Sequence, residues 1–567
     1  MKKGVKKMRK RRMWKCLVMM LSCVALALSL GGCNFFEEEV SEETVHISVM
    51  WDGLAYLDAE DQENNAVGNK IREEIGVDVE VTFINGSEAE NLTRTFAAGE
   101  NFPDVIMCPY WGGSDASSAA IREAAKAGYL LDLDALIEEY DCENLETAFE
   151  QGVSSDFVEY ELGAEEFGGK HYILPMHTPY SMEEAKNFGY TVYCRKDILE
   201  DLGVQPESIT SSQAVYDLAK KIEAGNYKDI NGNKIITAST WGNGWSYECY
   251  LNSFKTRGFT NLVKENDTYI WNAMSENLDA EVAFMNEFVN SGLFDISAFS
   301  QNSTQALQKH VVGGVGLTAA TYEHIYESLA GNLYKTNPEM RYVPLGPILD
   351  ANGNAAMPDT IQDDGRYGFA VLIITNECKN PEAVMKYLDY INSEEGKRLV
   401  YLGIEGEDWD FVENEEGEQV PQMTEQYFAE TEKNYDYKYT RGINSIYTLG
   451  VSRVHWNELS YAMNEGGEDI YYTQVKEMYP VQSYTGTRAN NFDDDYPEID
   501  ALRNRLAALD YSTIVTQMYT APDTASALEK LEQYREKLDK ENVLSDYLTW
   551  ISKTIQEQED SGRQILY

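Results

Sequence analysis

The chain has little basic charge for its length. Its 567 residues include 47 Lys and Arg against 95 Asp and Glu, a formal net charge of −48 at pH 7. Nine of the basic residues lie in the first fifteen positions, and without them 38 basic residues face 95 acidic ones, a net charge near −57. Such a surface repels nucleic acid and anionic lipid headgroups. The composition therefore excludes a nucleic-acid partner.

Cysteine and histidine are also scarce, with eight and six residues. The five cysteines beyond residue 33 are widely spaced and odd in number, so neither a disulfide framework nor a zinc site is indicated, and we expect buried free thiols. The histidines show no metal-ligand spacing. The sequence has no G-x-S-x-G, H-E-x-x-H or G-x-x-x-x-G-K-[ST] motif. We therefore predict no metal, no cofactor and no catalytic residues.

One long apolar run is present, and it lies at the N-terminus. Residues 16–32 contain no charge, follow the basic stretch and end in "LGGC". The run is shorter than the roughly 20 residues of a spanning helix and has the layout of a secretory signal. The stretch "LGGC" resembles a bacterial lipobox, which implies cleavage before Cys33 and acylation of its thiol. The acidic residues that follow predict a spacer, so lipid alone would hold the protein at the membrane.

Strand and helix patterns alternate after the spacer. "VHISVMW" reads as a strand, residues 64–75 as a helix that ends at Gly76, and "VDVEVTFI" as a strand with the two-residue period. Another helix leads to the apolar run "FPDVIMC". This order is typical of a doubly wound α/β lobe, in which ligands bind at the carboxyl ends of the strands. Those ends place Trp51, Asp52, Tyr110 and Trp111 among the candidate ligand residues.

The pattern recurs downstream. The apolar run at residues 369–374 predicts a buried parallel strand. Asn380 as N-cap and Pro381 at the first helical position then predict a helix, which Gly396 closes. Further helices are expected at residues 278–289 and near the C-terminus, where Leu528, Leu531, Tyr534 and Leu538 share one face.

Seven stretches together carry a resemblance to a known family. They are, in order, "FPDVIMC", "AGYLLDLDALI", "GGKHYILP", "CRKDILEDLGV", "GGVGLTAATY", "CKNPEAVMKYLDYINSEEG" and "YLGIEGEDW". Behind a lipobox, they resemble the extracellular solute-binding proteins (family 1) of carbohydrate ABC importers, in particular the large lipoproteins of Gram-positive bacteria. In the third stretch, a glycine turn precedes a short strand that Pro175 would end.

The resemblance implies a two-lobed periplasmic-binding-protein-like α/β fold (type II). Each lobe would be a doubly wound sheet flanked by helices, and a cleft between the lobes would close on a sugar. The expected parts are a signal peptide (1–32), a spacer (33–44), an N-terminal lobe (45–180 and 366–430) and a C-terminal lobe (190–350 and 440–567). We expect a monomer whose partners are a carbohydrate, the permease subunits and, through its lipid, the membrane.

The stretch "STWGNGWSYECY" offers the strongest ligand-binding pattern. Trp241 and Trp245 flank a Gly-Asn-Gly turn, which can present both indoles on one side of a loop. The apolar face of a sugar packs on aromatic rings, while its hydroxyls need polar partners such as Asn243 and Asp52. Either tryptophan could instead be a core residue. Additional candidates are Tyr180, Tyr322, Arg366 and Trp456.

Three questions stay open at this stage. "YKDINGNKII" and "LDANGNAAMP" resemble the start of a calcium loop but lack its twelfth-position glutamate, so plain Asn-Gly turns explain them better. Trp409, in "GIEGEDW", fits a solvated turn or a ligand contact. A secreted glycoside-active enzyme, with two carboxylates among 95 acids, and a peptide-binding ABC receptor remain alternatives. The strong negative charge favours neutral glycans over polyuronates unless the cleft is locally basic.

Overall fold

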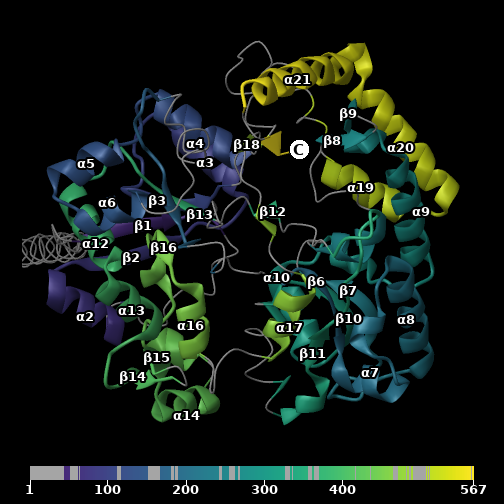
Figure 1. The fold of residues 1–567 in the computed structure, drawn as a ribbon, viewed down its shortest axis with the longest axis horizontal. Coiled ribbons are helices and arrows are strands. Elements are labelled where there is room, and N and C mark those ends of the chain that lie inside the picture. The colour runs from purple at the N-terminus through teal and green to yellow at the C-terminus, as the bar shows by residue number, and fades with distance from the viewer. Residues whose placement is uncertain are drawn as a thin grey trace, which may run out of the picture. The chain divides into compact units, whose positions relative to one another are not determined.

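The described part of the chain is organised around two β-sheets (Figure 1). The structure is a computed structural model, and it describes residues 44–51, 62, 64–110, 116–150, 167–180, 184, 189–241, 246–254, 262–265, 268–322, 324–325, 333–334, 336–355, 361–362, 370–414, 417–434, 436–463, 470–479, 482–483, 487–488, 506, 509, 511–562 and 565–566. Within these ranges, no helix combines the length and apolar composition needed to cross a bilayer.

The first sheet has the strand order β2-β1-β3-β13-β4. Strand β1 runs parallel to β3, whereas β13 runs antiparallel to both β3 and β4. All five residues of β13 are buried. The strands are β1 (Thr44–Val49), β2 (Asp78–Phe83), β3 (Val105–Pro109), β4 (Leu174–Met176) and β13 (Ala370–Ile374).

The second sheet has the order β11-β6-β10-β7. Strand β10 is parallel to β7 and antiparallel to β6, and β11 is antiparallel to β6. We call each sheet with the helices that share its hydrophobic cluster a lobe. The strands are β6 (Thr191–Arg195), β7 (Ile236–Thr240), β10 (Val315–Ala320) and β11 (Tyr342–Pro344).

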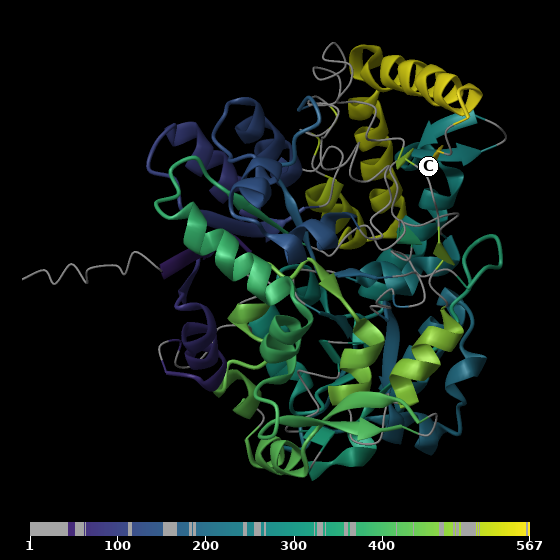
Figure 2. The same ribbon diagram turned by 60° about the vertical axis from the view of Figure 1, so that its left-hand side comes forward.

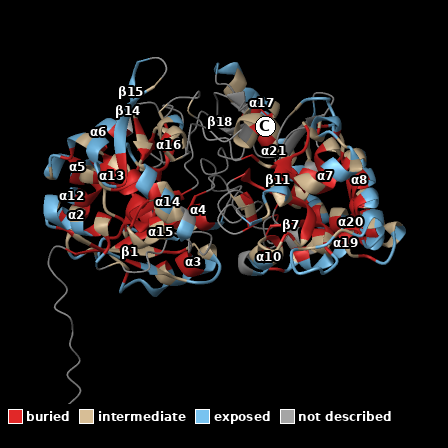
Figure 3. Ribbon diagram, turned by 90° about the horizontal axis from the view of Figure 1, so that it is seen from below, coloured by how far each residue is buried: buried red, intermediate tan, exposed pale blue. Residues whose placement is uncertain are grey.

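Amphipathic helices surround each sheet (Figures 1 and 2). Figure 3 shows the mixture of exposed and buried residues along α8 and α20, whose buried sides join the second core. The first lobe has α2 (Ala66–Ile75), α3 (Glu88–Ala98), α4 (Ala116–Lys126), α5 (Leu133–Glu139), α6 (Glu143–Glu150), α12 (Pro381–Asn392), α13 (Glu394–Leu402), α14 (Glu425–Lys433), α15 (Tyr437–Thr440) and α16 (Trp456–Met463). The second lobe has α7 (Lys196–Leu202), α8 (Ser212–Gly225), α9 (Glu276–Asn290), α10 (Ser303–His310), α17 (Ile470–Met478), α19 (Tyr511–Tyr519), α20 (Thr524–Leu538) and α21 (Val543–Asp560).

Short strand pairs complete the described elements. Residues at the start of β5 and β16 pair in parallel near the point where the chain leaves the first sheet. The pairs are β5 (Thr178–Pro179) with β16 (Arg453–Val454), β8 (Leu262–Glu265) with β9 (Thr268–Trp271), β12 (Ile361–Gln362) with β17 (Gln482–Ser483), β14 (Trp409–Glu413) with β15 (Gln419–Met423), and β18 (Thr487–Arg488) with β19 (Ile565–Leu566).

The chain passes between the lobes three times. It leaves the first lobe after β5, enters the second sheet at β6, and returns to the first sheet at β13. It passes to the second core again after α16, because Val475 and Tyr479 lie in that core. The lobe boundaries given above stay a prediction, but residues such as Ile443 and Tyr447 pack in the first core. We therefore assign residues 443–463 to the first lobe.

Three local predictions are wrong. The strand at residues 370–374 is antiparallel, because the chain reaches it from the other lobe and not through a βαβ crossover. Gly396 lies inside α13: the helix before it ends at Asn392, and Ser393 caps the next one by accepting a hydrogen bond from the amide of Gly396 at 3.0 Å. Pro175 lies within β4, which is tolerated because β4 is an edge strand.

Other local predictions are confirmed. Asn65 and Asn380 cap α2 and α12 with their side chains, and Gly76 ends α2 with φ of 69°. Both D-x-N-G-N segments form tight turns in which the aspartate accepts hydrogen bonds from the chain itself. Asp229 accepts from the amides of Asn231 and Asn233 at 2.8 Å, and Asp350 repeats the pattern in its own turn. Both carboxylates thus form hydrogen bonds to backbone amides of their own turns.

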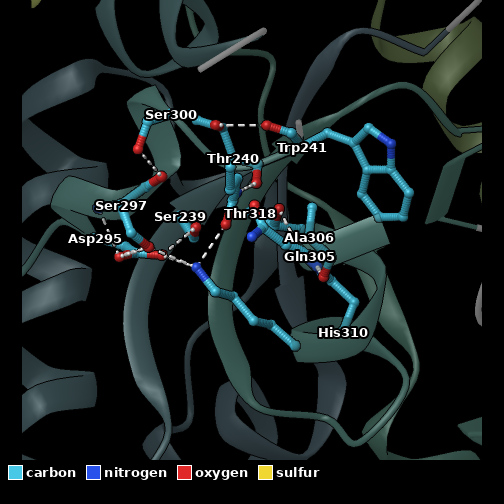
Figure 4. A network of polar contacts seen from close by, with 12 residues as sticks. Ser239, Thr240, Trp241, Asp295, Ser297, Ser300, Gln305, Ala306, His310 and Thr318 are labelled. Atoms are coloured by element: carbon cyan, nitrogen blue, oxygen red, sulfur yellow. Dashed lines mark hydrogen bonds and ion pairs between the residues drawn. The ribbon is translucent and has the colours of Figure 1, made fainter. Parts of the chain in front are cut away.

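A polar network fixes the end of β7, next to Trp241 (Figure 4). The Ser239 hydroxyl donates to Asp295, which also accepts from Lys309 at 2.6 Å. His310 is fully buried, with Nδ1 2.7 Å from the carbonyl of Ala306 and Nε2 2.8 Å from the Thr318 hydroxyl. A carbonyl only accepts, so Nδ1 is the protonated nitrogen and Nε2 accepts from Thr318. Burial lowers the pKa of His310 to about 4.

This buried histidine predicts acid sensitivity. An unfolded histidine has a pKa of about 6.5, so below this pH the histidine binds a proton in the unfolded chain but stays neutral in the native chain. The stabilisation is complete above pH 6.5 and is lost as pH falls toward about 4. We expect the loss to be on the order of 2–3 kcal/mol. Urea unfolding of the parent and of His310→Gln should therefore give curves of stability against pH that converge between pH 7 and 4.5, whereas parallel curves would contradict this role.

Candidate functional site

Several sequence-predicted site residues lie outside the described residues. They are Cys33, Asp52, Trp111, Asn243, Trp245 and Arg366. Their assignments therefore stay predictions. The other candidates are all described, and they fall into two groups, one in each lobe.

Two candidates from the first sheet differ in burial. Tyr110, just after β3, is fully buried, and its hydroxyl accepts a hydrogen bond from Arg122 of α4 at 3.3 Å. It fills the space between sheet and helix, which does not favour the predicted ligand contact. Trp51, after β1, is partly exposed and packs against the edge of the first core. Trp409 is only 3% exposed and donates to the carbonyl of Gly403 at 3.0 Å, so it is a core residue and neither a solvated turn nor a ligand contact.

Trp241 and Tyr322 belong to one hydrophobic cluster of the second lobe. The Trp241 indole lies between two imidazoles, with ring centroids 5.1 Å from His310 and 5.0 Å from His324. It is 5% exposed. Little of its ring is open in this structure, and the sequence alternative of a core tryptophan describes it well. The His324 imidazole is fixed by the Thr321 hydroxyl at 2.8 Å.

Tyr322 adjoins a group of rings around a cation. Its ring centroid is 5.2 Å from that of Tyr472 on α17, and its hydroxyl accepts from Arg341 at 3.4 Å. The Arg341 guanidinium lies 4.4 Å from the centre of the Tyr471 ring and 5.3 Å from that of Tyr334. We call Trp241, His324, Tyr322, Arg341 and Tyr472 the second-lobe cluster.

Tyr180 and Trp456 come together in the first lobe, although 276 positions separate them in the numbering. The pairing of β5 with β16 brings this about, because Tyr180 follows β5 and Trp456 follows β16. The Tyr180 ring stacks on His455, with centroids 3.9 Å apart and planes inclined by 6°. Trp456 meets the ring of His177 edge to face at 6.3 Å.

Charged groups surround the stacked rings of Tyr180 and His455. Lys397 of α13 donates to the Tyr180 hydroxyl and also binds Glu394 at 2.5 Å. The His455 imidazole lies 3.0 Å from both carboxylate oxygens of Glu184. The Arg453 guanidinium lies over the Tyr180 ring, 4.8 Å from its centre. We call Tyr180, Lys397, Arg453, His455 and Trp456 the first-lobe cluster.

Burial shapes the charge of the first-lobe cluster. Arg453 is 1% exposed, and burial lowers its pKa, while the Tyr180 and Glu184 side chains oppose this shift. Burial alone would raise the pKa of Glu394, but the hydrogen bond and charge of Lys397 lower it. Glu394 thus remains ionised at neutral pH and pairs with Lys397.

Sequence reasoning missed Lys397, Arg453 and His455. Arg453 and His455 stand in the segment "RVHWNEL", from which only Trp456 was selected. The pattern that could have identified them is a basic residue close to an aromatic residue at a short strand. Lys397 gave no local signal, because only the packing of α13 brings it to Tyr180.

The two clusters combine ring faces with fixed polar groups. Such faces pack against apolar C–H surfaces, and hydroxyl, imidazole and guanidinium groups orient a polar ligand. Across the described ranges, no three His, Cys, Asp or Glu side chains are grouped so as to hold a metal ion. The arrangement therefore fits reversible binding of a polar organic molecule.

Comparisons with known proteins agree with this interpretation. The model of the family described as "Bacterial extracellular solute-binding protein" matches residues 63–398, more than half of the chain. No curated protein sequence matches significantly.

Among solved structures, the S. pneumoniae ABC-transporter substrate-binding protein FusA in complex with kestose is 18% identical, with a TM-score of 0.63, over 91% of this chain and 100% of that one. The alginate-binding protein AlgQ2 without calcium ion is 16% identical, with a TM-score of 0.62, over 90% and 97%. An HMO-binding solute-binding protein of Bifidobacterium longum infantis is 15% identical, with a TM-score of 0.57, over 90% and 98%. At these identities the likeness shows the fold alone, and it confirms the two-lobed periplasmic-binding-protein-like architecture.

The family match settles the class of activity. It confirms the prediction of a receptor that binds a solute outside the cell, and it does not support the glycoside-active enzyme. The chain belongs to the bacterial extracellular solute-binding proteins.

Proposed function

We propose that the protein captures a sugar or oligosaccharide and delivers it to the permease of an ABC importer, while a lipid on Cys33 holds it at the outer face of the cell membrane. The observation that supports this best is the pair of ring-lined clusters in a chain of the solute-binding family. Solved proteins of the same fold bind kestose and Man5GlcNAc, which are oligosaccharides. A peptide receptor would need buried counter-charges for both peptide termini, and both acids beside the first-lobe cluster, Glu184 and Glu394, already bind basic side chains, which leaves neither as a partner for an amino terminus. The sugar is therefore the better fit.

Binding would use both lobes. In the proposed mechanism a saccharide packs on partly exposed rings such as Trp456, beside Tyr180, and the lobes then close by a hinge motion in the three crossovers. The ligand shifts a population from open to closed, and the closed form docks on the permease. The other predicted residues, among them Trp51, Trp245 and Tyr322, are proposed as further contacts.

The direct test is a ligand screen. Protein of residues 34–567 would be tested against an oligosaccharide panel by thermal shift, followed by calorimetry of each hit and an assay for cleaved products. A saturable ligand that raises the melting temperature and is recovered intact supports the proposal. Turnover of the ligand, or no response to any sugar, contradicts it.

Two tryptophans of the first lobe allow a matched comparison. Trp456 is partly exposed beside the stacked rings, whereas Trp409 is 3% exposed in the core. We expect Trp456→Ala to reduce affinity for the best ligand by about 1–3 kcal/mol with little change in melting. Trp409→Ala should leave affinity nearly unchanged in the folded protein but reduce stability by about 3–5 kcal/mol. Calorimetry and melting of both variants measure this, and parental affinity in Trp456→Ala would exclude that residue from the site.

The anchor can be tested through its cysteine. We expect Cys33→Ser to release the protein from bacterial membranes or to leave the precursor uncut, because the acylated thiol is lost. Cys23→Ser, within the same apolar run, is the control and should stay with the membrane fraction. Membrane fractionation with immunoblotting distinguishes these cases. Retention of a processed Cys33→Ser protein would disprove the lipid anchor.

A further inference from the structure

The Arg453 guanidinium is buried without a hydrogen-bonding partner. It is 1% exposed, and its three nitrogens contact no acceptor among the described residues. Arg195, the other arginine among the most buried side chains, shows the usual solution. It binds Asp197 at 2.6 Å and donates to the carbonyls of Lys228 and Gly313. Because a guanidinium offers five N–H donors, the lack of any acceptor at Arg453 marks an interaction that this form of the protein does not contain.

The neighbouring acids are already engaged. Glu184 binds His455 through both oxygens at 3.0 Å, and Glu394 binds Lys397 at 2.5 Å. Arg453 itself has only the face of Tyr180, at 4.8 Å. Among the cations of the first-lobe cluster, Arg453 is therefore the one whose charge no adjacent carboxylate neutralises by direct contact.

Local charge outweighs the net charge at this position. The protein is strongly acidic, but exposed charges farther away than about 8–10 Å are largely screened at physiological salt, whereas a buried group is screened much less. A buried charge without a partner destabilises the protein, and a group that pairs with it in good geometry offsets part of that cost. An anion that enters the first-lobe cluster would thus meet a desolvated cation, despite the surrounding acidic surface.

We propose that the first-lobe cluster recognises the carboxylate of an acidic saccharide, a uronate, with Arg453 as its pairing residue. This inference rests on the proposed saccharide function and adds the charge of the ligand. A carboxylate is planar and matches the guanidinium fork with two parallel hydrogen bonds. His455 and Arg453 cover the Tyr180 ring, whereas His455 and Trp456 are partly exposed, so these two rings are the part of the cluster that packs on the sugar ring. The expectation of neutral glycans from net charge is thereby replaced.

The test uses matched sugars. Lipid-free mature protein is titrated calorimetrically with a panel of di- to tetrameric galacturonides, glucuronides and mannuronides, and with the same oligosaccharides after reduction of their carboxyl groups. Each pair differs only in the carboxylate. We expect at least one uronide to bind about 10- to 100-fold more tightly than its reduced counterpart, as a hydrogen-bonded charge pair implies.

Two variants assign the effect to Arg453. Arg453→Met should lower affinity for the uronide about 10- to 100-fold and leave the reduced sugar unchanged. Its melting temperature without ligand should stay equal or rise, because a buried charge without a partner is removed. Arg398→Met is the control: it removes the same charge from α13, where Arg398 already binds Glu458 at 3.0 Å, and should keep the preference for uronide.

Each other outcome has a distinct meaning. If every uronide binds no more tightly than its reduced counterpart while sugars still bind, the inference is overturned and the saccharide receptor stands. Destabilisation of ligand-free Arg453→Met with unchanged preference would also overturn it, because Arg453 would then be structural. If no sugar binds, whether charged or reduced, the proposed function itself is contradicted.

Discussion

Strand β13 is the element on which the rest of the architecture depends. It lies between β3 and β4: all five of its residues pair with β3, the first three also pair with β4, and all five are buried. Without it, β3 and β4 would each present an unpaired edge inside the lobe, where water cannot satisfy the backbone groups. The strand reaches its place from the second lobe, so the first lobe exists only when the chain has passed through the other one. The crossovers, and the hinge proposed there, follow from this one insertion.

The second consequence of noncontiguous packing is the first-lobe cluster. Strands β5 and β16 are two residues long, yet their parallel pairing brings Tyr180 to Arg453, His455 and Trp456. Helix α13 then supplies Lys397. A group of cations and rings thus forms in a protein whose composition is dominated by acids. Net charge describes how the molecule meets its surroundings at long range, whereas the groups at a few ångströms decide which ligand it holds.

Features that depend on neighbouring residues could be predicted from the sequence, whereas features that depend on distant segments could not. The Asn380 cap and the Gly76 helix end were predictable, because each depends on residues within four positions. The fold class followed from alternating strand and helix patterns and from the resemblance. The direction of β13 and the place of residues 443–463 were not predictable, since both depend on pairing with segments far away. Trp409 shows the same limit: a loop of glycines and acids looked solvated, but packing buries its indole.

The threefold passage of the chain also sets an order for biosynthesis. The second sheet has all four strands once Pro344 has been made. The first sheet lacks β13, the strand between β3 and β4, until Ile374, and its core lacks Ala462 until later still. The first sheet therefore stays incomplete while the middle of the chain is synthesised. A first sheet that is completed late suits the predicted export of the chain across a membrane before it folds.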